Sequence, residues 1–511
     1  MPRFWLGLFV CAQVLYASTV NAAPLPFDAV DLSGDTVEYA SPASITASGN
    51  VVVSANPLII YASELAIDFD NQRVQFPQDM TLIHPQGELF GRAVSANYHQ
   101  GIGSAREVFL HIAPYFIRGA TLTFSPYSAV ISSASVTTCD LDPPHYIIKA
   151  KEVIFYPSLG MLVSLNDYLF VNNIPIFYFP SYIVGSRSYS LLGRYSPLPE
   201  IGSNVVEGPY IRSQLGYFLN EGSFGYGELG LTQRYGWLIG VNHLWDMSGN
   251  DNVSLHLGFL SGDGFRGGLS YTRDLVSPPT SEIQANPLDI FKLFSPRSLP
   301  YSRLHVQYTH RELVSDYWVS LAPHVGLEFP GFSWYDWQYR ANLNVANVIQ
   351  VDPSPAALPS VELFRYHADM TTERTYPLYP SLNMQLKGTY SGYWYNTVRP
   401  WQRLLGDIAF VTQVGPFTPK LTYTKLVANQ GQNPFQYDAI ETIDSDELGI
   451  HLRLDMGTMQ WVTDSSYNLW SNRFRRMENQ LIFGFHCWYL TTSWESVQKI
   501  FRLGVSLEAS R

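Results

Sequence analysis

The second half of the chain carries the feature that most limits what it can fold into. Beyond Pro180, short stretches alternate between apolar and polar residues and are separated by Gly, Asn, Asp and Ser. Such alternation is typical of strands that bury one face and are joined by tight turns. The clearest stretches are residues 226–233, 237–244, 253–259, 304–308, 421–426, 448–454 and 501–507. The second half is therefore predicted to be antiparallel β-structure.

Composition favours a membrane-spanning barrel for these strands. Only 15% of the residues are charged and 14% are aromatic, whereas soluble globular proteins carry about 25% charged residues. A lipid-facing surface with aromatic girdles explains both values. No run of about 18 apolar residues follows the N-terminal segment, so a closed barrel is the expected way to satisfy the backbone in lipid. A large extracellular sandwich or lectin is the alternative.

The predicted transmembrane antiparallel β-barrel covers residues 181–511. Roughly 310 residues, at about 18 residues per strand and turn, correspond to about 16 strands. Two long polar connections, near residues 277–300 and 350–359, are expected to be surface loops or internal segments.

The N-terminus has the pattern of a secretory signal peptide. Arg3 supplies the charge, residues 4–17 are an apolar run, and Val20-Asn21-Ala22 is a small-residue cleavage site. We therefore expect residues 1–22 to be removed on export.

Export gives the cysteines a defined role. Cys11 leaves with the signal peptide, so the mature chain keeps Cys139 and Cys487, which are 348 residues apart. Two cysteines in an oxidising compartment usually form one disulfide. The sequence thus predicts a Cys139–Cys487 disulfide that ties the first third of the chain to its C-terminal end.

Residues 23–180 repeat weakly and form the predicted first domain. Intervals of 29, 28 and 31 residues separate small residues, and apolar residues follow three and five positions later. A period of about 30 residues marks stacked supersecondary units, and apolar residues two apart mark strands with one buried face. The small residues are Ala62, Gly91, Gly119 and Ala150; the apolar ones are Leu65, Val94, Leu122 and Val153, then Ile67, Ala96, Phe124 and Phe155. We predict a jelly roll or an open, V-shaped β-structure.

The inward apolar row of this domain has two interpretations. It is either ordinary core or, if the roll stays open, a groove for acyl chains. The candidate groove residues are Val51, Val53, Ile60, Leu65, Ile67, Val94, Leu122 and Phe124.

Several classes of function are disfavoured. A net charge of −11 argues against a nucleic-acid partner, because phosphate binding needs a basic surface. No motif locates a nucleophile beside a base, so we expect no enzyme activity and no catalytic residues. His305 and His310 are five residues apart and should lie on opposite faces of a strand, which disfavours a shared metal. We expect no metal site and no cofactor.

Four segments resemble the LPS-assembly protein family LptD, also called organic solvent tolerance protein. They are residues 137–157 (TTCDLDPPHYIIKAKEVIFYP), 171–185 (VNNIPIFYFPSYIVG), 191–211 (LLGRYSPLPEIGSNVVEGPYI) and 486–495 (HCWYLTTSWE). The signal peptide, repeated domain and barrel also follow the family's order, so the resemblance covers nearly the whole chain. Better-known members carry four mature cysteines and longer barrels than this chain.

The resemblance implies a function and a set of partners. A periplasmic jelly roll (OstA-like) would receive lipopolysaccharide from an LptA-like bridge protein. The barrel, in the outer membrane with an LptE-like plug lipoprotein, would release it sideways into the outer leaflet.

Lateral release requires a weakly paired seam in the barrel wall. Proline removes a ladder hydrogen bond, and Pro197, Pro199 and Pro209 cluster where the first barrel strands should begin. These prolines are the lateral-gate candidates, and Pro209 is the preferred one because it adjoins the alternating run 210–218. A break in an interdomain linker is the other interpretation of Pro197 and Pro199.

Three hypotheses follow for function. The first is a lipid-translocating barrel, the second a passive diffusion porin with a periplasmic accessory domain, and the third an outer-membrane lipid hydrolase. A porin does not need a repeated domain of this size, and a hydrolase should show a nucleophile and a base. We favour the first.

Overall fold

The computed structural model describes residues 31–506 apart from 42, 56–57, 85–86, 113–114, 157–160, 186–197, 248–249, 276–301, 315–316, 352–359 and 442–444. The expected signal peptide, Pro197 and most of the two long connections lie outside the described residues. Within the described part, nearly all regular structure is β: thirty strands and the short helix α3 (Gln436–Glu441). The one helix described is too short to cross a membrane.

The chain divides into two compact units. The first comprises Met1–Tyr195, Leu215–Glu221 and Pro279–Arg297, and the second comprises Ser196–Gln214, Gly222–Pro278 and Ser298–Arg511. The alternating pattern of the second half begins after Pro180. This residue lies inside the strand β12 (Ile174–Gly185), which pairs along its length with β11 of the first unit.

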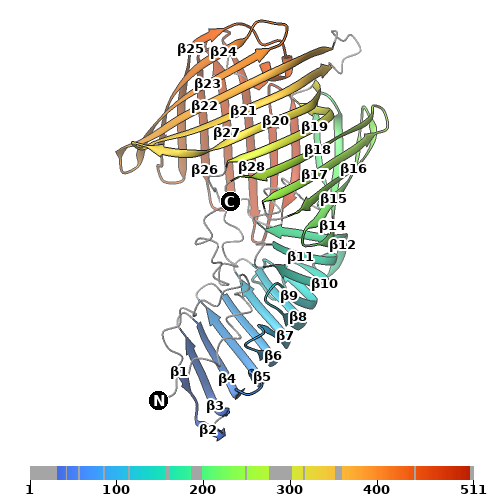
Figure 1. Ribbon diagram of the computed structural model, residues 1–511, viewed down its shortest axis with the longest axis vertical. Coiled ribbons are helices and arrows are strands. Elements are labelled where there is room, and N and C mark those ends of the chain that lie inside the picture. Colours follow the sequence, from blue (N-terminus) through green and yellow to red (C-terminus); the bar gives the residue numbers. More distant parts are fainter. Residues whose placement is uncertain are drawn as a thin grey trace. The chain divides into compact units, whose positions relative to one another are not determined.

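The first unit is a stack of antiparallel strands, drawn from blue to teal in Figure 1. From β3 to β12 each strand pairs with the next one in the chain, while β1 and β2 both pair with β3. The strands are β1 (Asp31–Ser33), β2 (Thr36–Ser41), β3 (Ser44–Ala55), β4 (Leu58–Asp68), β5 (Arg73–His84), β6 (Gly87–Asn97), β7 (Ile102–Ile112), β8 (Tyr115–Phe124), β9 (Ala129–Thr137), β10 (Tyr146–Tyr156), β11 (Met161–Val171) and β12.

Most strands of the stack bend near their middle. Residues there take a positive φ, including Asn50, Ala93, Glu107, Ser133 and Asn166. Several ladders shift register at the same level, as between Ser48 and Val51. A bulge of this kind bends the strand and re-aims its side chains. Each strand therefore contributes two short arms to one curved inner face.

The 30-residue repeat has a packing cause. The four small residues fall on every second strand, β4, β6, β8 and β10, so one repeat is one hairpin. At Gly119, a Cβ would lie 2.1 Å from Cγ2 of Ile131 on the neighbouring strand. Only a residue without a Cβ fits there. Leu65, Val94 and Leu122 then face the interior and are buried.

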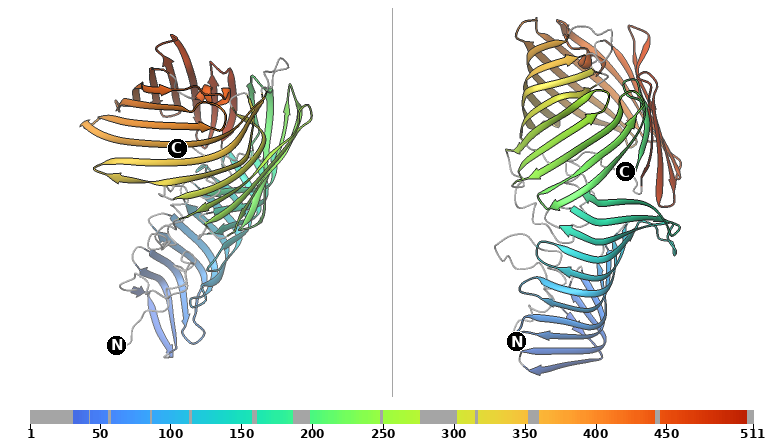
Figure 2. Two further views of the ribbon diagram at one scale, coloured as in Figure 1. Left: turned by 45° about the horizontal axis from the view of Figure 1, so that its top comes forward. Right: turned by 90° about the vertical axis from the view of Figure 1, so that its right-hand side faces the viewer.

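The second unit is a closed antiparallel barrel of eighteen strands, β13 to β30. Consecutive strands are neighbours, and β13 pairs with β30 to close the ring; its wall runs from green to red in Figure 2. The strands are β13 (Glu200–Asn204), β14 (Gly208–Asn220), β15 (Ser223–Thr232), β16 (Gly236–Asp246), β17 (Asp251–Leu260), β18 (Gly264–Asp274), β19 (Arg303–Val314), β20 (Tyr317–Trp334), β21 (Trp337–Val351), β22 (Val361–Tyr379), β23 (Leu382–Tyr395), β24 (Trp401–Thr412), β25 (Phe417–Gln430), β26 (Glu447–Asp455), β27 (Met459–Asn468), β28 (Arg473–Phe485), β29 (Trp488–Glu495) and β30 (Ile500–Ser506).

The predicted strand number was therefore too low, eighteen against about 16. The barrel strands range from five residues in β13 to nineteen in β22. Many hairpins are also tight. For example, only three residues separate β15 from β16. Division by one average length cannot capture this spread. The seven alternating stretches all fall on strands, and none extends more than one residue beyond its strand, although most strands are longer than the stretch that predicted them.

Candidate functional site

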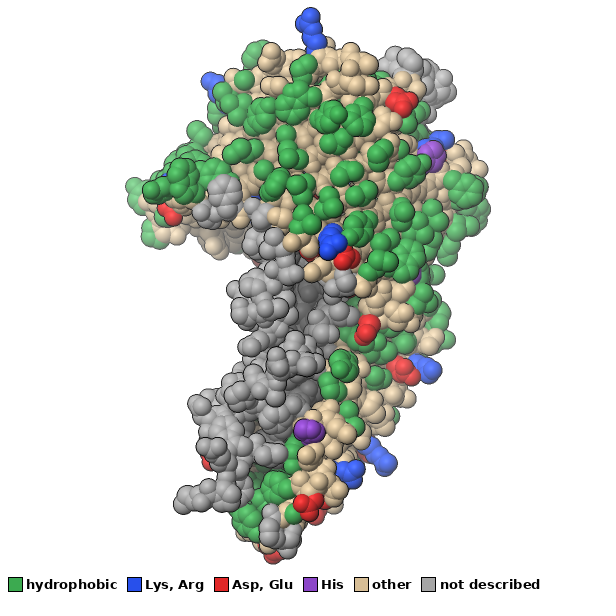
Figure 3. Space-filling view, viewed as in Figure 1, with side chains coloured by type: hydrophobic (Ala, Val, Ile, Leu, Met, Phe, Trp, Pro, Cys, Tyr) green, Lys and Arg blue, Asp and Glu red, His purple; other side chains and the backbone are tan. Residues whose placement is uncertain are grey.

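The barrel wall separates an apolar outer face from a polar inner face, as the composition predicted. On β22, Tyr366 and Met370 are about half exposed and face outward. Arg365, His367 and Asp369 alternate with them and face inward. Figure 3 shows apolar side chains over the outside of the strands, with few charges among them. An apolar band around a polar interior is the pattern of barrels that cross a membrane.

Large aromatic residues mark both rims of the barrel. Trp334 and Tyr335 lie at the β20–β21 turn and Tyr379 at the end of β22, at one rim. Trp237, near the start of β16, and Trp470, in the β27–β28 turn, lie at the opposite rim, and all five side chains are exposed. Aromatic rings at both ends of an apolar band are suited to the two membrane–water interfaces.

The seam between β13 and β30 is short. Its ladder contains three residue pairs, Ile201 with Leu503, Gly202 with Arg502, and Ser203 with Phe501. By contrast, β29 and β30 share seven pairs and β15 and β16 share ten. Opening the wall between β13 and β30 therefore breaks fewer ladder hydrogen bonds than opening it between β29 and β30 or between β15 and β16.

Close packing holds the short seam in register. A Cβ at Gly202 would lie 2.4 Å from the Tyr210 hydroxyl and 2.8 Å from the carbonyl oxygen of Phe501. The Tyr210 hydroxyl donates to Oε1 of Glu200 at 2.8 Å, and the Arg212 guanidinium stacks over the Tyr210 ring. The seam thus depends on a glycine that lets the two backbones and one ring approach.

The gate prolines lie in different positions from those expected. We expected the seam strand to follow Pro209, but Pro209 is on β14 and pairs with Ser203 of β13, one strand away from the seam. Pro199 directly precedes the seam strand β13. Of the described candidates, Pro199 is therefore the one placed to limit the length of the seam. Pro197 lies outside the described residues.

All eight groove candidates face the interior of the first unit and are buried. Val51 and Val53 lie on β3, Ile60, Leu65 and Ile67 on β4, Val94 on β6, and Leu122 and Phe124 on β8. Tyr61, between two of them on β4, is exposed on the other face. The row is thus continuous across several strands, as the repeat predicted, while acyl-chain binding stays a prediction.

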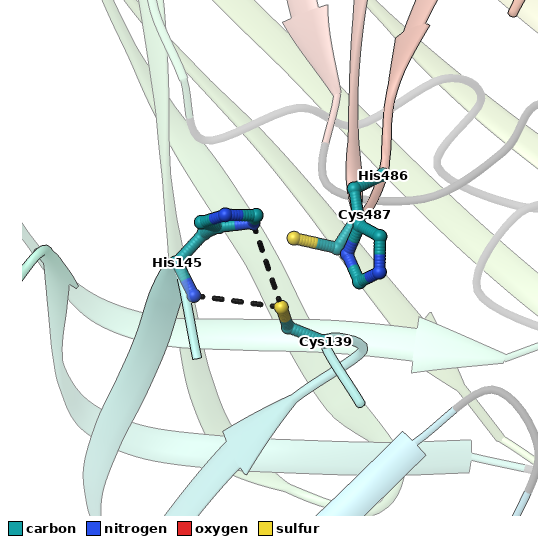
Figure 4. A group of neighbouring side chains, drawn as sticks. All are labelled: Cys139, His145, His486 and Cys487. Atoms are coloured by element: carbon teal, nitrogen blue, oxygen red, sulfur yellow. Dashed lines mark hydrogen bonds between the residues drawn. The ribbon is translucent and has the colours of Figure 1, made fainter. Parts of the chain in front are cut away.

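The two cysteines lie in different units; His145 follows Cys139 six residues later in the chain, and His486 directly precedes Cys487 (Figure 4). Cys139 follows β9 and is buried, and its thiol sulfur accepts a hydrogen bond from the backbone N–H of His145 at 3.4 Å. The backbone N–H of Cys139 donates to the Thr137 hydroxyl at 3.0 Å. Cys487 is buried at the β28–β29 turn and follows His486, which has a positive φ. No disulfide is recorded within the described part of the chain, so the predicted bond stays a prediction.

The two histidines considered as a metal pair lie on opposite faces of β19, as predicted. His305 pairs with inward-facing Thr272 and His310 with Gly267. The actual neighbour of His305 is His324 on β20, with ring centroids 4.8 Å apart. Sequence reasoning missed this pair because it compared positions along one strand and not across the ladder.

A buried carboxyl group in the first unit was also missed. Asp167 on β11 is fully buried, and its Oδ2 accepts a hydrogen bond from the Ser164 hydroxyl at 2.7 Å. Its Oδ1 is buried without a hydrogen-bond partner. Burial raises the pKa of Asp167 to about 7, against 3.8 ordinarily, although the hydrogen bonds oppose the shift. Asp167 lies an even number of residues from Met161, Val163 and Leu169, which are also buried, so strand alternation already places it on the inner face.

Asp167 makes the first unit less stable as pH rises. Its folded pKa lies above its unfolded pKa, so the folded state binds the proton more tightly and stability falls between about pH 4 and pH 7. A shift of roughly 3 units corresponds to about 4 kcal/mol at most. We expect Asp167→Asn to raise the urea midpoint of the first unit at pH 8 and to remove its pH dependence. Limited proteolysis of the full-length protein in detergent, over a series of urea concentrations at pH 4.5 and at pH 8, measures this midpoint.

The exposed Asp70 supplies the control for that experiment. Asp70→Asn should leave the difference between the two pH values as in the wild type. An unchanged pH dependence in Asp167→Asn would show that another group causes it.

No protein-family model and no curated protein sequence matches this chain. Among solved structures, it is similar to CdiB from Acinetobacter baumannii at 9% identity and a TM-score of 0.29, over 61% of this chain and 59% of CdiB. It is also similar to a loop L8 deletion mutant of OmpT, an outer membrane protein of Vibrio cholerae. The identity is 8% and the TM-score 0.23, over 60% of this chain and 95% of the mutant. The PapC translocation pore of the P pilus usher is similar at 10% identity and a TM-score of 0.22, over 90% of this chain and 94% of PapC. The chain spans less than two thirds of CdiB, and likenesses this distant carry no argument about function.

Proposed function

We propose that this protein inserts lipopolysaccharide into the outer leaflet of the outer membrane. The short β13–β30 seam is the observation that carries the proposal, because acyl chains cannot remain in a polar lumen and must leave through the wall. The polar inner face suits the sugar part of the molecule, and the buried apolar row of the first unit suits its acyl chains.

The proposal assigns a place and partners to each unit. The first unit, as a jelly roll in the periplasm, takes lipopolysaccharide from an LptA-like bridge protein. The barrel spans the outer membrane and holds an LptE-like lipoprotein. The protein acts by binding and release, without catalysis. The resemblance of residues 137–157 and 486–495 to the LptD family supports these roles.

Depletion of the protein in its host tests this function. Newly made, pulse-labelled lipopolysaccharide should fall at the cell surface and accumulate inside, while other outer-membrane barrels still assemble. Normal surface lipopolysaccharide in fully depleted cells would rule the proposal out.

A passive diffusion porin is the second candidate, because the inner face of β22 carries polar and charged residues. It predicts that depletion slows uptake of small hydrophilic solutes and leaves surface lipopolysaccharide unchanged. The same depleted cells distinguish the two functions.

The inner apolar row should contact lipid during transport. A buried methylene contributes about 0.8 kcal/mol, so several acyl carbons hold a chain firmly and still allow stepwise transfer. We expect photo-crosslinkers at Ile60, Leu65 or Ile67 to capture lipopolysaccharide in cells. A crosslinker at Tyr61, on the outer face of the same strand, is the matched control and should capture much less. No capture at the three inner positions in a functional protein would mean that the row is a filled core.

A further inference from the structure

The connection between β25 and β26 folds back onto the inner side of the barrel wall. Residues 433–438, named here the luminal flap, include the start of α3, which Figure 2 draws in orange inside the ring of strands. Phe435 of the flap is fully buried. It belongs to an apolar cluster with Val319, Ala346, Val348 and Leu363.

Strand alternation shows that this cluster lies on the luminal face. On β21, Leu343 is about half exposed and faces outward, so Ala346 and Val348 face inward. On β22 the outward residue is Tyr366, which places Leu363 and Arg365 on the inner side. The flap therefore occupies part of the lumen.

Polar contacts fasten the flap beside Phe435. Nη1 of Arg365 on β22 lies 2.6 Å from Oδ2 of Asp438. The backbone N–H of Tyr437 donates to Oε1 of Gln350 at 3.0 Å, and the Tyr317 hydroxyl donates to Oε1 of Gln436 at 2.6 Å. The flap thus contacts strands β20, β21 and β22 through one ion pair and two hydrogen bonds.

The burial of the ion pair distinguishes this docking from an ordinary loop contact. The side chains of Arg365 and Asp438 are only 13% and 17% exposed. A second luminal pair, Arg340 with Glu373, lies away from the flap and is 61% and 38% exposed. Loops usually run over the surface, and burying two charges is unfavourable unless they stay paired. The Arg365–Asp438 ion pair therefore stabilises the docked flap, and loss of either charge should strongly destabilise the docked position.

The flap lies at one particular end of the barrel. The strands β26, β27 and β28 each cross the wall once, so the flap lies at the end opposite the β28–β29 turn that carries Cys487. If Cys487 is joined to the periplasmic unit, the flap is at the extracellular mouth.

We propose that the luminal flap is a built-in lid that restricts the passage of polar solutes through the barrel and opens when the Arg365–Asp438 pair separates. Phe435 then leaves its apolar cluster, and Asp438 is hydrated. The lid goes beyond the lipid-insertion function, because it controls the lumen and not the seam.

Conductance through the purified full-length protein in planar phosphatidylcholine bilayers with KCl tests the lid. Asp438→Asn keeps the shape of the side chain and removes its charge, which leaves Arg365 unpaired. Removing one partner of a buried pair shifts such an equilibrium by roughly 100-fold. We expect a several-fold rise in mean conductance. The matched control Glu373→Gln breaks the exposed luminal pair and should conduct like the wild type.

A locked variant keeps the test decisive. Tyr317→Cys and Gln436→Cys, added to Asp438→Asn, place two thiols on the two sides of the Tyr317–Gln436 hydrogen bond, and a cleavable bis-maleimide can span the gap left by the shortened side chains. Crosslinking should return the conductance to the wild-type level and cleavage of the linker should restore the rise, while Asp438→Asn alone should not respond to the reagent. Heat-modifiable electrophoretic mobility shows that each barrel is folded. Wild-type conductance in folded Asp438→Asn, or an equal rise in Glu373→Gln, would overturn the lid. Surface lipopolysaccharide, measured separately, reports on the insertion function and not on the lid.

Discussion

Joining β13 to β30 with an engineered disulfide should block delivery of lipopolysaccharide to the cell surface. Ile201→Cys and Leu503→Cys place the thiols at a directly paired position of the seam. Opposite residues of an antiparallel ladder have Cα atoms about 4.5–5.5 Å apart, within the range that a disulfide spans. If lipid leaves through this seam, the covalent bond closes the only three-pair ladder described in the barrel wall, and reduction should restore delivery.

A second crosslinked variant controls for general rigidity. Leu229→Cys and Ile239→Cys join β15 to β16 at paired, outward-facing positions of a ten-pair ladder. This barrel should deliver lipopolysaccharide normally when oxidised. Undiminished delivery with the seam fully crosslinked would exclude the seam as the exit. The crosslink belongs on β13 and not on β14, because β14 is one strand removed from β30.

We expect Cys139 and Cys487 to form a disulfide, and its loss should cause the largest loss of stability of any single change considered. Closing a loop of 348 residues contributes roughly 5–6 kcal/mol in the chain-entropy model, an upper figure because strain and residual structure reduce it. Non-reducing electrophoresis of the mature protein, with and without Cys487→Ser, should show a mobility difference. Cys487→Ser should also make the first unit much more sensitive to protease.

Thiol counting separates a disulfide from other bonds between these residues. Each cysteine has a histidine nearby in the sequence, His145 or His486, and thiol with imidazole is also a zinc ligand set. Denatured, non-reduced protein should therefore be treated with a maleimide reagent, with and without a chelator. A disulfide gives no labelling in either sample. Two reactive thiols would contradict the predicted bond, and labelling that appears only with chelator would indicate a metal in its place.

The repeat and the alternation were readable because each follows from local chemistry. A glycine at position 119 reflects the contact that Ile131 would make with a Cβ, and the alternating run at 253–259 reflects one face toward lipid and one toward the lumen. Both signals recur at a regular period along the chain, about 30 residues for the repeat and two for the alternation. The strand number was not readable, because strands of five and nineteen residues produce similar short alternating runs.

The sequence by itself determined an all-β chain with a stacked first half, an alternating second half and a buried apolar row, and its export stays a prediction. These properties depend on which residues are apolar and on the period at which they recur, so they can be recognised from residues that are near one another in the chain. Only the tertiary structure decided that β13 meets β30, that the Asp167 carboxyl is fully buried, and that Asp438 reaches Arg365. The residues of the seam and of the ion pair are far apart in the chain, so ring closure and side-chain packing, and not local propensity, bring them together.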